Sequence, residues 1–163
     1  MPSYVKGADP LFTSEAYNNM GVCHLSQLRI ADSNDLKLHC LAAAEKAFLN
    51  VQPPETPPGE PPSEMYLARF LNLSMVFRSR AQIYQAANDN KQAIHELEHA
   101  IELTLQGCAS NVSFWKLPHE LALCRLDMVG LLSSFNESTL LATATLLSEA
   151  PHTRFFVALL CLL

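Results

Sequence analysis

The sequence predicts an all-α protein in which a single domain, residues 1–163, is built from antiparallel helical hairpins. The 163 residues are 49% hydrophobic and 17% charged and include only 5 glycines, a composition typical of a folded, helix-rich domain. Apolar residues recur at spacings of three and four, which is the period of an amphipathic helix. No window alternates strictly between apolar and polar residues, so no half-buried strand is expected.

The first predicted hairpin covers residues 14–51. Ser14 is placed to cap its first helix, and a polar turn at residues 32–35 separates that helix from a second one over about 36–51. The small and apolar positions of the second helix are Cys40, Ala43, Ala44, Ala47, Phe48 and Val51.

A proline-rich loop follows at residues 52–63. Six of the 10 prolines lie between Pro53 and Pro62, and proline both fixes φ and lacks the backbone N–H that a helix needs. The loop spells P-x-x-P twice, which would suit an SH3 or WW ligand. Its only charged residues are acidic, however, so we interpret it as a stiff connection between helices.

The central hairpin is predicted over residues 64–107. Its first helix starts after Ser63 and reaches about Ala87, and the turn signal at residues 88–90 leads into a second helix. Gly107 is placed as the residue that ends this second helix, because glycine readily adopts the left-handed conformation found there.

A third hairpin is predicted over residues 117–150, with Pro118 in the first turn of its first helix and Pro151 after its second. Phe114 and Trp115 precede it, and we expect core packing or a hydrophobic staple there, with a partner interface as the alternative.

The apolar tail at residues 152–163 ends the chain. Its unbroken apolar run, residues 155–163, is shorter than the roughly 20 residues that span a bilayer, so no integral membrane span is expected. It is interpreted as a helix that a longer chain would continue, with a buried terminal helix or a membrane-surface anchor as alternatives. Phe155 and Phe156 are candidate partner contacts within it.

Large and small residues of the central hairpin follow a recurring order, with spacings of 4, 3, 9, 4 and 3 residues. The six positions predicted to pack the hairpin are Phe77, Ala81, Tyr84, Ala93, Leu97 and Ala100. This pattern resembles the tetratricopeptide repeat (TPR), in which small residues let two helices approach closely. Arg80 departs from it where a leucine is usual, and Leu105 where a proline is usual.

Weaker copies of the same pattern flank the central hairpin, around Gly21 and around Gly130. The intervals are irregular, since Gly21 lies 60 residues before Ala81 and Gly130 lies 49 residues after it. We therefore predict a TPR-like α-solenoid of about three antiparallel hairpins with irregular repeat length.

Residues 14–106 also resemble the forty-kilodalton huntingtin-associated family of TPR-like proteins. The resemblance rests on an alanine-rich helix, LAAAEKAFLN, followed by a break and the long hairpin LARFLNLSMVFRSRAQIYQAANDNKQAIHELEHAIEL. It implies a scaffold that docks on huntingtin in early-endosome and vesicle traffic. It also implies a cytoplasmic protein that is endosome-associated or nuclear, and it brings no catalytic residues.

The stretch His95-Glu96-Leu97-Glu98-His99 matches H-E-x-x-H, a pattern that holds zinc in metalloproteases. A zinc-dependent hydrolase needs both imidazoles to point into a cleft and a third ligand downstream. At about 100° per residue both histidines lie opposite the apolar arc and should face solvent. No H-x-x-G-x-x-H extension follows either. We interpret the pair as an exposed face of the helix, with weak metal binding and a hydrolase as alternatives.

Charge and composition narrow the function further. The formal net charge is −5, and the 11 Lys and Arg residues are scattered, so nucleic acid is not an expected partner. The odd set of 5 cysteines has no C-x-x-C and is expected to be reduced and buried inside a cell. We assign no catalytic, cofactor-binding or metal-binding residues. The leading hypothesis is a non-enzymatic scaffold that binds a protein, with huntingtin as the candidate, and a membrane-peripheral adaptor using residues 152–163 is an alternative.

Overall fold

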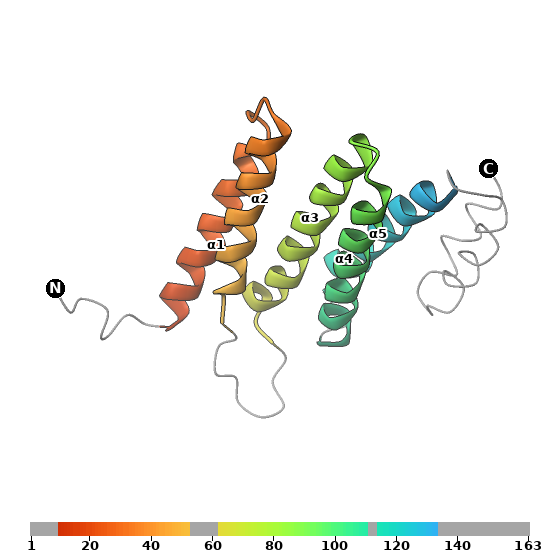
Figure 1. Cartoon of the computed structure of the whole chain (residues 1–163). Helices are drawn as coiled ribbons and strands as arrows, with labels where there is room; N and C mark the ends of the chain where they lie inside the picture. Colours follow the sequence, from red (N-terminus) through yellow and green to blue (C-terminus); the bar gives the residue numbers. More distant parts are fainter. Residues whose placement is uncertain (1–9, 53–61, 111–113, 134–163) are drawn as a thin grey trace.

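The computed structural model describes residues 10–52, 62–110 and 114–133. The helices of this part are α1 (Pro10–Gln27), α2 (Asn34–Leu49), α3 (Glu64–Ala86), α4 (Asn90–Ser110) and α5 (Lys116–Ser133). The described residues contain no strand, so the all-α prediction is confirmed. Figure 1 shows α1 to α4 side by side in chain order, running alternately up and down, with α5 crossing α4 obliquely.

Polar side chains cap the first turns of α2, α3 and α4. The hydroxyl of Ser33 accepts a hydrogen bond from the Leu36 amide at 3.2 Å, and that of Ser63 accepts one from the Tyr66 amide at 3.3 Å. Each bond satisfies an amide that the first turn of a helix leaves unpaired. The start of the third helix after Ser63 is therefore confirmed.

The turn between α3 and α4 lies where the sequence predicts it. Asn88 adopts a φ of 60°, a left-handed conformation that asparagine tolerates better than most residues. Asp89 then accepts a hydrogen bond from the Gln92 amide at 3.2 Å, which caps the start of α4.

Ser14 does not cap the first helix, contrary to the prediction. Helix α1 begins at Pro10, so Ser14 lies inside it and is only 3% exposed. Its hydroxyl accepts a hydrogen bond from the Gln52 amide at 3.1 Å and lies 3.4 Å from the Gln52 carbonyl oxygen. The side chain thus joins α1 to the segment that leaves α2.

Gly107 does not end the fourth helix, contrary to the prediction. Helix α4 continues to Ser110, and Gly107 is buried inside it. A Cβ atom at this position would lie 2.7 Å from Leu117 Cδ1 and 3.0 Å from Phe70 Cβ. The glycine is therefore needed for close packing of α4 against α3 and α5, where contacts below about 3 Å are not tolerated.

The core between the first two hairpins is built around Phe48. The buried cluster that joins α2 to α3 consists of Leu41, Ala44, Phe48, Leu73 and Val76. Phe48 is fully buried, and its ring lies against Gly21 of α1, where any larger side chain would collide with it. The small residue on α1 thus lets three helices share one aromatic ring.

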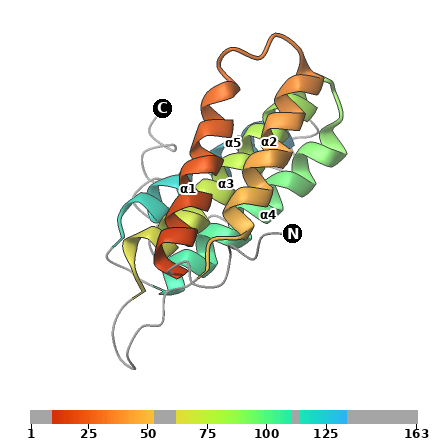
Figure 2. The ribbon, with the colours of Figure 1, turned by 90° about the vertical axis from the view of Figure 1, so that its left-hand side faces the viewer.

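Helix α3 is central to the packing. The packed pairs of the described part are α3 with α4, α1 with α2, α4 with α5, α2 with α3, α3 with α5, and α1 with α3. Helix α3 thus contacts each of the other four, whereas α2 and α4 are not a packed pair. Figure 2 views the molecule from the α1 side, with α1 and α2 in front of α3 and α4.

Candidate functional site

The six residues of the repeat pattern lie on α3 and α4, and several of them pack where these two helices meet α5. Ala81, Ala93 and Leu97 are buried in one cluster with Leu131 of α5, and Tyr84 packs against that cluster. Ala100 is fully buried, and Phe77 is half-buried. Three alanines at these positions allow α3 and α4 to approach closely, which makes this the most extensive helix pair in the described part.

The third copy of the pattern packs differently from the first. Gly21 is buried against Phe48, but Gly130 is exposed, and a Cβ atom there would meet nothing within 4 Å. The second helix predicted for the hairpin over residues 117–150, the tail at 152–163 and its Phe155 and Phe156 lie outside the described residues.

Phe114 and Trp115 diverge at the start of α5. Phe114 packs against the buried cluster of Leu67, Phe70 and Leu117, and the Lys116 ammonium lies 5.8 Å from its ring centroid. Trp115 is 69% exposed, so the expectation that it packs in the core or forms a staple is wrong. The structure leaves its indole available to solvent.

The HELEH stretch divides between two sides of α4. His95 and His99 are exposed, as their position opposite the apolar arc predicts, and Leu97 is 3% exposed in the core. Glu96 is also buried, at 8% exposure, which the sequence pattern did not predict. The glutamate that a hydrolase would use as a base therefore points away from the imidazoles and into the packing between helices.

Arg80 explains why Glu96 can be buried. Its guanidinium forms ion pairs with Glu96 of α4 at 3.2 Å and with Glu45 of α2. The side chain of Arg80 is 14% exposed, so the charge is largely removed from water and needs these partners. Arg80 thus connects α2, α3 and α4 through ion pairs, at a position where the predicted repeat pattern would have a leucine.

The charges of this triad shift one another's ionisation. Burial raises the pKa of Glu96, although the neighbouring Arg80 opposes that effect. Burial alone would lower the pKa of Arg80, but its hydrogen bond to Glu45 and the charges of Glu96 and Glu45 raise it. The guanidinium therefore stays charged, and Glu96 takes up a proton more readily than a carboxyl group in water.

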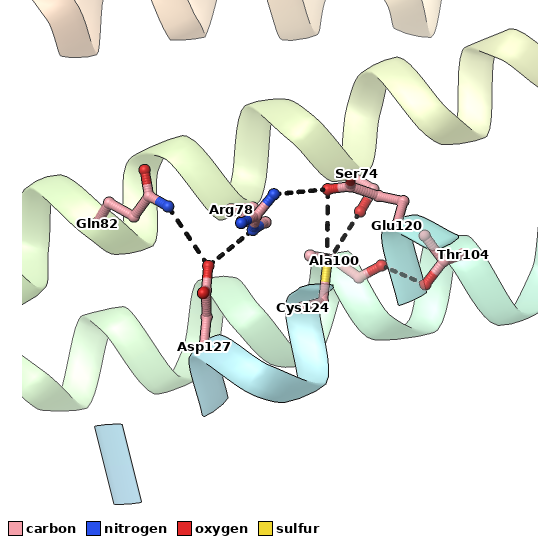
Figure 3. A network of polar contacts seen from close by, with 8 residues as sticks. All are labelled: Ser74, Arg78, Gln82, Ala100, Thr104, Glu120, Cys124 and Asp127. Carbon is pink, nitrogen blue, oxygen red and sulfur yellow. Dashed lines mark hydrogen bonds and ion pairs between the residues drawn. The ribbon is translucent and has the colours of Figure 1, made fainter. Parts of the chain in front are cut away.

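Arg78 makes a second polar connection, on the side of α3 that faces α5 (Figure 3). Its Nε donates a hydrogen bond to Asp127 Oδ2 at 2.7 Å, and its Nη1 lies 3.6 Å from Glu120 Oε1. Gln82 donates a hydrogen bond to the same Asp127 oxygen at 3.4 Å. These contacts join α3 to α5 at two positions, Glu120 and Asp127.

Ser74, Cys124 and Glu120 continue this network into the interior. The Ser74 Oγ and Cys124 Sγ atoms lie 3.4 Å apart, and Cys124 Sγ lies 3.8 Å from Glu120 Oε1. Burial raises the pKa of the Cys124 thiol to about 12, so the thiol is protonated and is not a nucleophile at neutral pH. Burial also raises the pKa of Glu120. The group joins α3 to α5, and the Glu120 carboxyl and the Cys124 thiol both hold a proton more tightly than they would in water.

The cysteines are less uniformly buried than the sequence predicts. Cys40 and Cys124 are buried, whereas Cys108 is partly exposed and Cys23 is exposed. All four are free thiols. Cys23 is exposed on α1, as are the apolar residues Met20 and Val22 of the same helix, so an apolar residue type did not predict burial there.

Sequence reasoning missed the two arginine connections, and only one of them left a signal. Arg80 departs from the repeat pattern, and a charge at a position that should be apolar predicts a buried ionic partner. Arg78, by contrast, is not one of the positions of that pattern, so no departure from it marks this residue. Its pairing with Glu120 and Asp127 depends on how α5 lies against α3.

Two further observations concern metals and membranes. Within residues 10–52, 62–110 and 114–133, no group of three or more His, Cys, Asp or Glu side chains gathers closely enough to hold a metal ion. None of the helices described is both long enough and apolar enough to cross a membrane.

Comparisons with known proteins do not assign the chain to a group. No family model, no curated protein and no solved structure matches it. The resemblances drawn from its repeat pattern and helix order therefore remain predictions, and the case for a function depends on the geometry described above.

Proposed function

We propose that the protein is a non-enzymatic interaction module of TPR type that binds another protein along the row formed by α1, α3 and α5. The observation that carries this proposal is the order of packing. Helix α1 packs against α3 and α3 against α5, whereas α2 and α4 are not a packed pair. This is the order expected when helical hairpins stack and each contacts only its neighbours.

The same packing order supports a curved surface. The helices α1, α3 and α5 pack against one another in sequence, whereas α2 and α4 do not pack against each other. The stack therefore curves so that α1, α3 and α5 lie on its inner side. The concave surfaces that repeat proteins use for binding arise from such small rotations between successive repeats. The inner row is therefore the face on which we place the partner.

Exposed apolar residues lie at one level of this row. The amide of Asn72 on α3 donates a hydrogen bond to Asn18 on α1 at 3.0 Å, which marks where the two helices meet. One turn further along these two helices, which run in the same direction, are Val22 at 43% exposure and Met75 at 41%. Exposed apolar side chains on one face of a protein are characteristic of surfaces that bind other proteins.

The polar interior supports a scaffold more than a catalyst. Arg78 and Arg80 each pair with two carboxylates, and all of these pairs join one helix to another. Glu96, the base that a zinc hydrolase would require, is held by Arg80 on the side of α4 away from both histidines. The charged groups of Arg78, Arg80 and their carboxylate partners thus form ion pairs between helices.

Direct binding to purified huntingtin tests the proposal, because the resemblance over residues 14–106 implies that partner. We expect the full chain to bind in biolayer interferometry, and the double variant Val22→Asp with Met75→Asp to bind at least about tenfold more weakly, as for residues at the centre of an interface. The matched control is Leu105→Asp on α4, which has a similar exposure of 43% and lies outside the row.

Two results would count against the proposal. A control variant that weakens binding as much as the double variant would move the partner to another face. A chain that is folded by circular dichroism yet shows no binding would remove huntingtin as the partner, and the same three proteins would then be compared against partners recovered by affinity purification and mass spectrometry.

A further inference from the structure

We propose that His95 and His99 form a two-ligand site for a late transition-metal ion, Zn²⁺ or Cu²⁺, on the solvent-facing side of α4. The site is separate from the row of α1, α3 and α5 and does not depend on the function proposed above. It takes the histidines of the HELEH stretch as metal ligands and assigns no catalytic role to Glu96.

The positions of the two rings carry the proposal. The residues are one turn apart on α4, both are exposed, and their ring centroids are 4.5 Å apart. Neither ring makes a hydrogen bond with any other described residue, so lone pairs on the imidazole nitrogens are free for an ion. Two imidazoles one helical turn apart can ligate the same ion after small rotations about their side-chain bonds.

Packing restricts one of the two ligands in advance. The His99 ring lies against the Phe77 ring of α3, with centroids 5.4 Å apart and an interplanar angle of 30°. A ring held on one side by an aromatic neighbour loses less conformational entropy when it binds an ion. Phe77, a member of the repeat pattern, therefore contributes to the site as a positioning residue.

The charges around the site favour a cation. The Arg80 guanidinium carbon lies 5.2 Å from the centroid of the Phe77 ring, which also contacts His99. The positive charge of the guanidinium is paired with both Glu45 and Glu96. Glu98 and Glu102, which are exposed, follow His95 and His99 by three residues each on the same helix. Lys91, one turn before His95, is also exposed, so these two carboxylates and one ammonium leave a net negative charge that raises the concentration of divalent cations near the rings.

The ligand set limits which ions bind and what they do there. Imidazole nitrogen suits copper, nickel and zinc, and affinity rises toward Cu²⁺, whereas Mg²⁺ prefers oxygen ligands. Since no third His, Cys, Asp or Glu of the described part completes the set, water or a group from another molecule fills the remaining positions. The site would bind an ion without forming the closed coordination of a structural zinc centre.

Isothermal titration of the full chain with CuSO₄ and with ZnCl₂ tests the proposal. We expect one ion per chain, tighter binding of Cu²⁺ than of Zn²⁺, and no heat from MgCl₂. His95→Gln and His99→Gln should each weaken Cu²⁺ binding at least tenfold. The matched controls, His39→Gln and His119→Gln, replace exposed histidines that have no second histidine one turn away, and they should leave binding unchanged.

A second readout separates the site from damage to the fold. Circular dichroism should be the same for all four variants, and electron paramagnetic resonance of the Cu²⁺ complex should show two nitrogen ligands in the wild type and one in either site variant. Wild-type affinity in His95→Gln, equal losses in a control variant, or the absence of Cu²⁺ binding to the folded chain would each overturn the proposal.

Discussion

Arg78 and Arg80 lie two residues apart on α3 yet connect it to opposite neighbours. Arg80 reaches α2 and α4 through Glu45 and Glu96, and Arg78 reaches α5 through Glu120 and Asp127. The side chain of Arg80 is 14% exposed and that of Arg78 is 22% exposed.

The difference in burial shows how one helix can use the same residue type in two ways. Two residues along an α-helix turn the side chain by about 200°, so the two guanidinium groups leave α3 on nearly opposite sides. The more deeply buried arginine depends more on its partners, because less water is available to compensate when they are lost.

The largest effect is expected for Arg80→Met. Methionine has an apolar side chain of similar length, but it leaves Glu96 and Glu45 without their cation. We expect a loss of about 3 kcal/mol in the free energy of unfolding, the scale found when one partner of a buried pair is removed. Urea denaturation followed by circular dichroism measures it, and a loss below about 1 kcal/mol would show that the triad is effectively solvent-exposed.

Replacing the whole triad should restore most of that loss. In the triple variant with Arg80→Leu, Glu45→Met and Glu96→Met, no charge remains without a partner, and the leucine typical of the repeat pattern is in place. Apolar replacements of buried ion pairs are often neutral or stabilising. We expect unfolding within about 1 kcal/mol of the wild type or better, and a triple variant as unstable as Arg80→Met would indicate that the charges specify the packing.

A smaller effect is expected for Arg78→Met. Asp127, its closer partner, has a side chain that is 29% exposed and can be hydrated when the arginine is gone. We expect a loss of about 1–2 kcal/mol, between the values of surface and buried pairs. The same denaturation experiment checks it, and a loss equal to that of Arg80→Met would remove the distinction drawn between the two sides of α3.

A double-mutant cycle measures whether the two sides are independent. Arg80→Met and Asp127→Asn affect residues with no shared partner, so their effects should add within about 0.5 kcal/mol. Arg80→Met and Glu96→Gln affect one ion pair and should show a coupling energy above about 0.5 kcal/mol. A large coupling in the first cycle would show that α3 transmits changes from one hairpin to the next.

The smallest effect is a pH dependence that both sides should share. Burial raises the pKa of Glu96 and of Glu120, so each binds a proton more tightly in the folded chain than in the unfolded chain. Where the folded state holds more protons, stability falls as pH rises, here from the unfolded value of 4.5 upward.

Glu96→Gln and Glu120→Gln remove this effect, each on one side of α3. The free energy of unfolding of each variant, relative to the wild type, should therefore increase as pH rises from about 4.5 to 7. Urea denaturation across this range measures the trend. A difference that stays constant with pH would show that these carboxyl groups titrate alike in the folded and unfolded chain.

Local patterns in the sequence predicted the helices well and their ends less well. The turn at Asn88 and the start of α3 after Ser63 follow from short-range chemistry, because the groups involved lie within a few residues of each other. Ser14 and Gly107 misled for one reason. Each has a residue type typical of a helix end, but each lies inside a helix because another segment contacts it there. Gln52 donates a hydrogen bond to Ser14, and Leu117 packs against Gly107.

The candidate sites divide in the same way. The exposure of His95 and His99 and the burial of Leu97 follow from the period of one helix, so the sequence alone was sufficient for them. The exposure of Trp115 and the pairing of Arg78 with α5 were not predictable, because they depend on the angle at which one helix approaches another.

The sequence by itself determined that the described part of the chain is helical, where the turn between α3 and α4 lies and which face of α4 is apolar. These properties depend on residues within about one or two helical turns of each other, where periodicity and capping act directly. Tertiary structure alone decided that Phe48 packs on Gly21, that Arg78 and Arg80 connect α3 to opposite neighbours, and that Glu96 is buried. Those outcomes depend on contacts between residues far apart in the chain. The local pattern marks Arg80 as unusual, but it does not specify which residues become its partners.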